Sequence, residues 1–262
     1  MASSVHVSGA TLEPSYQAVA HDRAYAVQLP FGYNPMRPYR TVFVTAPCGG
    51  GLGDGRFDSA ERADHDSIYV NLAGPPSAIN EQGCADNTGV KSTEWEYFAL
   101  VAQQVESDFC VDKNDELVAG GRAGGTLANM LGCYFATVDK TRLFGPDLFL
   151  RGQLSILSAV PFELPTCGAP IAALFMHDEL EFTPIGESMA SLDRVISLDG
   201  CSNDSAAWGT DQLLDIGCKK YTCPGNVPVI FCATTGMGRQ GNYYSISAPA
   251  LVQFMAEVEA TR

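Results

Sequence analysis

Short apolar runs rich in β-branched residues recur along the chain, and they constrain its fold more than any other feature. There are five such runs: Thr41–Val44, Ser67–Val70, Glu116–Ala119, Ile171–Met176 and Val227–Phe231. Continuous apolar runs of this length are typical of strands that are buried on both faces of a sheet. The chain must therefore provide layers that cover the sheet on both sides.

Helical patterns lie between these runs. Thr93 and Glu96 have the spacing of a capping box, and an apolar face then repeats from Phe98 to Phe109. Residues 126–135 and 249–259 also have helical patterns. Because strands and helices alternate, the sequence predicts the α/β class, with a mostly parallel sheet and helices on both faces.

Composition excludes several classes of protein. Hydrophobic residues make up 46% and charged residues 18% of the chain, which excludes a disordered polymer. With 16 Lys and Arg against 30 Asp and Glu, the net charge of −14 argues against nucleic acid and against an anionic membrane surface. The sequence contains no apolar stretch of about 18 residues that could span a membrane. We expect one domain over residues 32–262, with residues 1–31 as a segment packed on it or leading into it.

The nine cysteines form no Cys-x-x-Cys pair, and no histidine lies at zinc-ligand spacing beside one, so we expect no metal site. They are either free buried thiols or disulfides, and disulfides would indicate an oxidising compartment. An odd count leaves at least one thiol unpaired. Residues 1–9 lack the pattern of a signal peptide, so either the chain is a trimmed form or it is not secreted. One Asn-x-Ser triplet, Asn203–Ser205, supports secretion.

The segment with the most chemical information runs from Leu117 to Met130, where a short strand leads through a glycine-dense turn into a helix. This is the setting of the nucleophile elbow, Gly-x-Ser-x-Gly, in which small residues allow backbones to approach closely. Gly120 and Gly124 stand at the outer positions, but the middle position is Arg122. Neither phosphate-binding glycine motif fits the segment.

At this point the chain resembles a known family, the secreted feruloyl esterase and polyhydroxybutyrate depolymerase-like esterases, a branch of the α/β-hydrolases. The resemblance extends from about Gly32 to Met255. It is carried by Gly32–Pro35, Arg37–Tyr39, Pro47–Gly50, Ser92–Tyr97, Val105–Asp112, Gly200–Cys201, Cys218–Tyr221 and Phe231–Cys232. The resemblance implies an α/β-hydrolase fold and a carboxylic ester hydrolase mechanism without a cofactor.

The family mechanism needs Ser, Asp and His in that chain order. By resemblance these positions fall on Arg122, Glu181 and Arg239. A guanidinium stays protonated and has no lone pair for attack, so it is neither nucleophile nor general base. The sequence therefore predicts that no catalytic residue of the triad is intact.

The resemblance also implies an oxyanion-like site at Cys48, Gly49 and Ala123. It further implies four disulfides and leaves Cys48 single. The implied pairs are Cys84–Cys110, Cys133–Cys167, Cys201–Cys232 and Cys218–Cys223.

Several features allow more than one interpretation. Arg122, Glu181 and Arg239 either fill an inactive site or form an anion site, since an arginine fork grips a carboxylate. His177 is interpreted as a hydrogen-bonded turn residue rather than as part of a relocated esterase site. The acidic stretch Asp54–Asp66 lacks the EF-hand spacing and is interpreted as a solvated loop rather than a calcium site.

We carry three hypotheses for function. The first is a catalytically inactive feruloyl esterase-like protein with a binding or structural, self-associating extracellular role. The second is an active carboxylic ester hydrolase, a feruloyl or polyester esterase with an unconventional site. The third is a carboxylate-binding protein that uses Arg122 and Arg239. The partners implied are a small carboxylate, an aromatic ester or a polysaccharide-linked ligand, and a second copy of the chain.

Overall fold

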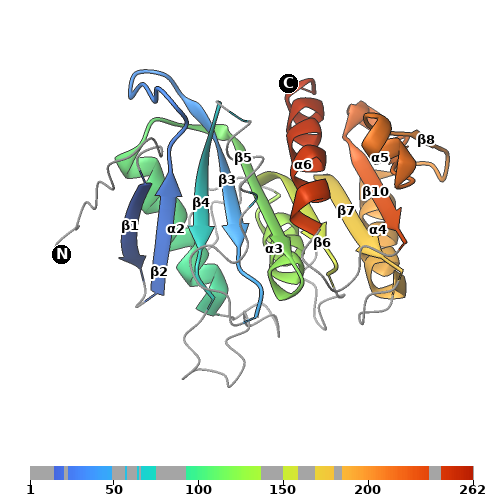
Figure 1. The fold of residues 1–262 in the computed structure, drawn as a ribbon, viewed down its shortest axis with the longest axis horizontal. Coiled ribbons are helices and arrows are strands. Elements are labelled where there is room, and N and C mark those ends of the chain that lie inside the picture. The colour runs from blue at the N-terminus through green and yellow to red at the C-terminus, as the bar shows by residue number, and fades with distance from the viewer. Residues whose placement is uncertain are drawn as a thin grey trace.

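The structure is a computed structural model, and its main feature is one ten-stranded sheet among the described residues (Figure 1). The described residues are 15–20, 23–48, 57, 64, 66–74, 93–136, 150–158, 169–179, 185–235 and 243–261. The sheet order is β1-β2-β4-β3-β5-β6-β7-β10-β9-β8. The strands are β1 (Ser15–Ala20), β2 (Arg23–Gln28), β3 (Tyr39–Thr45), β4 (Ser67–Leu72), β5 (Val111–Gly121), β6 (Leu150–Ile156), β7 (Ala172–Asp178), β8 (Ser205–Ala207), β9 (Lys219–Tyr221) and β10 (Val229–Thr234).

The centre of the sheet is parallel and its two margins are antiparallel. Strands β4, β3, β5, β6, β7 and β10 pair in parallel, whereas β1 and β2 at one margin and β9 and β8 at the other pair antiparallel. The carboxyl ends of the parallel strands therefore meet along one edge, where α/β proteins place their ligand sites.

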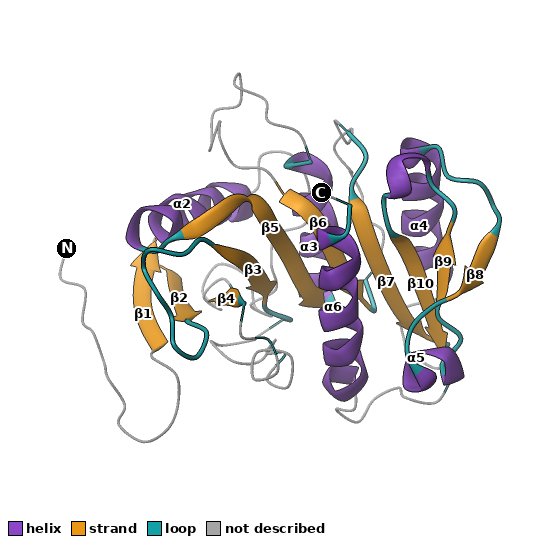
Figure 2. Cartoon of the chain, turned by 90° about the horizontal axis from the view of Figure 1, so that it is seen from above, coloured by secondary structure: helices purple, strands orange, loops and turns teal. Residues whose placement is uncertain are grey.

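Helices cover both faces of the sheet (Figure 2). The helices are α2 (Thr93–Asp108), α3 (Ala123–Tyr134), α4 (Ile185–Asp199), α5 (Asp211–Asp215) and α6 (Tyr243–Glu259), with a 3₁₀ turn at Pro224–Asn226. Side chains alternate along β5: Val118 packs into the core under α2 and α3, while its neighbours Leu117 and Ala119 pack into the core under α6. A third cluster joins α4 to β7 and β10.

The predicted layered α/β arrangement is confirmed. Each of the five apolar runs lies in or overlaps a strand, namely β3, β4, β5, β7 and β10. The helix expected over residues 249–259 is longer than predicted, because α6 begins at Tyr243 and carries Pro249 inside. Strands β1 and β2, from the segment predicted to precede the domain, belong to the same sheet. The domain boundaries themselves stay a prediction.

Two of the expected disulfide pairings are wrong. The structure joins Cys201 to Cys223 and Cys218 to Cys232. The reason is strand register: Lys219 of β9 stands opposite Phe231 of β10, so the antiparallel pairing brings the next residues, Cys218 and Cys232, together. Cys201 follows α4, and its neighbour Ser202 donates its N–H to the carbonyl of Thr222, which places Cys201 beside Cys223.

Of the remaining described cysteines, Cys133 is disulfide-bonded as expected, whereas Cys110 and Cys48 differ from expectation. Cys110 was expected to be bonded to Cys84, but it is a free, half-buried thiol. Cys48 was expected to be single, but it is disulfide-bonded, as is Cys133. Cys84 and Cys167 lie outside the described residues. Several disulfides in one chain are typical of proteins from oxidising compartments.

Candidate active site

A strained turn joins β5 to α3 at the carboxyl edge of the sheet. Its tip, Arg122, has φ 56° and ψ −126°, which is a backbone conformation that non-glycine residues rarely adopt. The Arg122 N–H donates to the carbonyl of Ile156 in β6 at 2.8 Å, and its own carbonyl accepts from Thr126 in α3. Such strain persists only where the surroundings fix it, and it concentrates at functional sites.

The two outer glycines of this turn are required by close backbone contacts. A Cβ atom on Gly120 would lie 2.6 Å from the carbonyl carbon and oxygen of Gly124, and one on Gly124 would lie 2.7 Å from the carbonyl oxygen of Ala46. Real Cβ atoms do not approach so closely. The Thr45 hydroxyl donates to the Gly124 carbonyl at 2.7 Å, which fixes the end of β3 against the elbow. The segment therefore has the elbow geometry that its glycine spacing predicts.

The position of Arg122 is electrostatically unusual for a helix start. Arg122 is exposed and occupies the N-cap of α3, makes no side-chain cap hydrogen bond, and has no acidic residue in the helical turn that follows. The N-terminal end of a helix carries a partial positive charge, so a cation there costs about 0.3–1 kcal/mol. An anion at the same place is stabilised by both the amide groups and the guanidinium.

The other predicted site residues are only partly covered by the structure. Ala123 is the first residue of α3, directly after the elbow. Cys48 is exposed and lies two residues beyond Ala46, which contacts the elbow at Gly124. Glu181, Arg239 and Gly49 lie outside the described residues, so the assignment of a triad-equivalent cluster and an oxyanion-like site stays a prediction.

His177 lies in β7, not in a turn, and it is held in a buried polar chain. Its Nδ1 lies 2.8 Å from the Ser188 hydroxyl, and that hydroxyl donates to the carbonyl of Ser158 at 2.9 Å. Ser188 has one proton, so His177 donates at Nδ1 and does not act as the base for Ser188. Both side chains are about 1% exposed. Sequence reasoning did not identify this Ser–His pair. A substrate could not reach the buried Ser188 hydroxyl, and His177 donates a hydrogen bond to it rather than accepting one, so the pair is not a relocated nucleophile and base.

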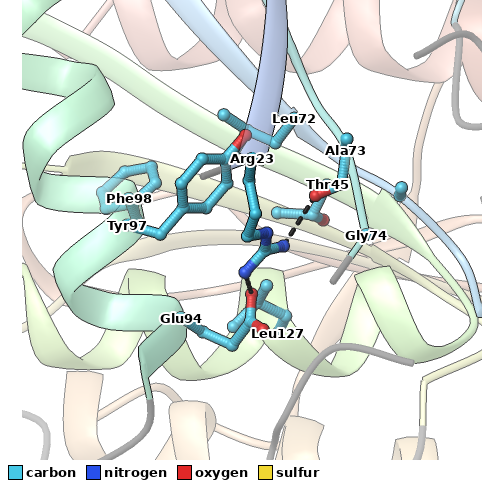
Figure 3. A pocket seen from close by; sticks show the side chains of 10 residues that line it. Arg23, Thr45, Leu72, Ala73, Gly74, Glu94, Tyr97, Phe98 and Leu127 are labelled. Atoms are coloured by element: carbon cyan, nitrogen blue, oxygen red, sulfur yellow. Dashed lines mark hydrogen bonds and ion pairs between the residues drawn. The ribbon is translucent and has the colours of Figure 1, made fainter. Parts of the chain in front are cut away.

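Beside the elbow lies a small, mostly apolar pocket that holds a buried ion pair and that sequence reasoning also missed (Figure 3). Arg23 of β2 extends into it, pairs with Glu94 of α2 at 2.7 Å and donates to the Ala73 carbonyl at 2.6 Å. The guanidinium carbon lies 4.0 Å from the centre of the Tyr97 ring. Arg23 and Glu94 are 71 positions apart, so no local pattern could have joined them. Thr45, Ala46 and Leu127 line both this pocket and the surroundings of the elbow.

Only Asp64 and Asp66 of the acidic stretch fall among the described residues. Asp64 accepts hydrogen bonds from the Tyr69 hydroxyl and the Asp66 N–H, and Asp66 pairs with Arg37. Within the described ranges, no group of His, Cys, Asp and Glu could hold a metal ion.

A fully buried carboxyl lies in β5, away from the elbow. Glu116 is 0% exposed, and neither of its oxygens has a hydrogen-bond partner among the described residues. It stands in register with Thr41 of β3, whose hydroxyl likewise has none there. Burial, and to a lesser degree the charge of Glu106, raises the pKa of Glu116 well above its ordinary value of 4.5, while Lys113 acts in the opposite direction.

We expect Glu116→Gln to remove a pH dependence of folding. The unfolded chain loses this proton near its ordinary pKa while the native chain retains it, so native stability falls as pH rises above that value. The maximum slope is about 1.4 kcal/mol per pH unit. Urea unfolding between pH 5 and pH 8 should show the native chain losing stability relative to the variant. Parallel curves for the two proteins would contradict this assignment.

The mostly parallel sheet covered by helices, together with the strained turn between β5 and α3, is the arrangement of the α/β-hydrolase fold. The structure superposes on an acetyl xylan esterase from Aspergillus awamori with a TM-score of 0.66 and 11% sequence identity. The superposition covers 92% of this chain and 99% of the esterase. A ferulic acid esterase from Anaeromyces mucronatus superposes with a TM-score of 0.54 and 10% identity, over 96% of this chain and 93% of the esterase. The S-formylglutathione hydrolase of Staphylococcus aureus superposes with a TM-score of 0.58 and 13% identity, over 92% of this chain and 94% of the hydrolase. At these identities the likeness concerns the fold.

Sequence comparison adds a weaker likeness to an esterase. The chain is 28% identical over 119 residues to feruloyl esterase C of Emericella nidulans, a match that covers 42% of this chain and 41% of that protein. No family model matches the chain. No helix in the described part is long and apolar enough to cross a membrane.

Proposed function

We propose that this chain is an esterase-like α/β-hydrolase that does not hydrolyse esters and acts outside the cell by binding or by self-association. The observation that carries the proposal is Arg122 at the tip of a strained elbow whose flanking glycines have the required spacing. The backbone that positions a nucleophile is retained, while the side chain at its tip cannot attack a carbonyl. The resemblance to feruloyl esterases and the disulfides support an extracellular protein.

The first test compares ester hydrolysis by the native chain and by Arg122→Ser/Arg239→His, using a short-chain p-nitrophenyl ester and methyl ferulate. We expect no turnover by the native chain. The variant should gain at least about 100-fold over that background, a small part of the roughly 10⁶-fold that triad residues contribute in serine hydrolases.

The matched control is Arg122→Ala/Arg239→Ala, which removes the same charges without adding a nucleophile or a base and should stay inactive. Clear native turnover that a serine-directed inhibitor abolishes would overturn the proposal. That result would support instead an active carboxylic ester hydrolase with an unconventional site.

A second candidate function, carboxylate binding through Arg122 and Arg239, is favoured by one observation. Arg122 is exposed at the N-terminus of a twelve-residue helix with no acidic residue in its first turn. A carboxylate there would meet a guanidinium and the positive end of a helix dipole.

Calorimetric titration with acetate and with ferulate tests this second function. Arg122→Ala should abolish any binding seen with the native chain. Arg37→Ala, which alters an exposed arginine at the opposite edge of the sheet, should leave it unchanged. Equal affinity of the native chain and Arg122→Ala would eliminate carboxylate binding at the elbow.

A further inference from the structure

The turn between α4 and β8 carries a potential modification site outside the elbow. Asn203, Asp204 and Ser205 form the one Asn-x-Ser/Thr triplet in the 262-residue sequence. All three residues are exposed in the structure, and Asn203 lies in a bend before the strand begins. Enzymes that attach oligosaccharides to asparagine need this triplet in accessible chain, with any residue except proline in the middle.

The backbone around Asn203 is fixed while its side chain is available. Ser202 donates its N–H to the Thr222 carbonyl at 2.9 Å, and Thr222 donates back to the Asp204 carbonyl at 3.1 Å. The Ser202 hydroxyl also accepts from the Asp204 N–H at 3.2 Å. The Asn203 amide itself makes no hydrogen bond within the described part of the chain, so modification breaks no native interaction there.

The adjacent strand gives a physical reason for a bulky group at this position. Strand β8 (Ser205–Ala207) is the last strand of the sheet, all three of its residues are exposed, and among the described residues it pairs with β9 alone (Figure 2). An exposed strand edge can pair with other chains, and proteins protect such edges by shortening or covering them. A glycan on Asn203, two residues before β8, would cover this edge with hydrated sugar.

We propose that Asn203 is an N-glycosylation site, an inference that rests on the extracellular part of the proposed function. The donor is an oligosaccharide joined to a lipid diphosphate in the secretory compartment. The Asn203 Nδ2 forms a bond to the anomeric carbon, the bond from that carbon to the diphosphate breaks, and the lipid diphosphate leaves with the electron pair. The amide nitrogen gives up one proton, and no oxidant or reductant is needed.

Translation of the full chain behind a cleavable signal peptide, in the presence of eukaryotic microsomes, tests the proposal. Only chains protected from added protease are scored, so failed translocation cannot be mistaken for an unmodified site. We expect one discrete step in mass, removed by a peptide amidase that releases N-glycans and converts Asn203 to aspartate. Asn203→Gln and Ser205→Ala should each abolish the step.

Two matched variants complete the experiment. Ser205→Thr preserves the acceptor triplet and should retain the mass step, as should Ser202→Ala, which alters the neighbouring serine outside the triplet. Protected native chains of unshifted mass would overturn the site, while leaving the proposed inactivity at Arg122 unaffected. Conversely, ester hydrolysis by the native chain would overturn that inactivity without changing the mass of the protected chain.

Discussion

Replacing Gly124 with alanine should lower the free energy of unfolding by about 3 kcal/mol or more, at the upper end of overpacking effects. The added methyl group would meet the backbone carbonyls of Thr45 and Ala46, and backbone cannot move aside as the end of a flexible side chain can. Relief would require the end of β3 to separate from the elbow, which breaks the hydrogen bond from Thr45 to Gly124. Urea unfolding followed by circular dichroism measures the loss.

The matched control for this prediction is Gly186→Ala in α4. Among the described residues, no heavy atom outside its own helix backbone and chain neighbours lies within 4 Å of the Cβ position at Gly186. Alanine there should be neutral or should stabilise the chain by up to about 1 kcal/mol, because it favours the helix. Equal free energies of unfolding for Gly124→Ala and Gly186→Ala would contradict the close backbone contact between β3 and the elbow.

Removing one partner of the buried Arg23–Glu94 pair is the second change with a large expected effect. Arg23 is 6% exposed and Glu94 is 1% exposed, so Glu94→Ala or Arg23→Ala leaves a charge in the interior. Such changes cost about 3–5 kcal/mol. Arg23→Ala also removes the hydrogen bond to Ala73 and the stacking on Tyr97. Thermal and urea unfolding should both show the loss.

Two further variants make this second prediction specific. Arg37→Ala breaks an ion pair between two exposed side chains, for which about 0–1 kcal/mol is expected. The double variant Arg23→Met/Glu94→Leu should recover much of the loss, because apolar residues of similar volume can replace a buried ion pair. A double variant no more stable than either single change would show that the pair is not the origin of the effect.

The features that could be predicted from the sequence are those that local spacing encodes. Gly120, Arg122 and Gly124 lie within five consecutive residues, so strand, turn and helix could be assigned from their order alone. The five apolar runs likewise mark the buried strands without reference to the rest of the chain. Strands β8 and β9 have three residues each and no apolar run, and they were not predicted.

The features that were missed or wrong depend on contacts between distant residues. The Arg23–Glu94 pair joins β2 to α2, and a lone arginine in a strand carries no sign of its partner. Disulfide pairing failed for the same reason, because the register of β9 on β10 decides that Cys232 meets Cys218 rather than Cys201. Register is set by the packed sheet, and cysteine spacing does not report it.

The disulfide at Cys48 has a consequence for the carboxylate binding proposed at the elbow. The segment that follows β3 is held covalently at Cys48 and packs at Ala46 against Gly124. A ligand that reaches Arg122 would therefore find a surface already in place, and less conformational entropy would be lost on association. Binding would then require little conformational change in this part of the protein. Thiol-reducing conditions would weaken this recognition even where they leave the fold intact.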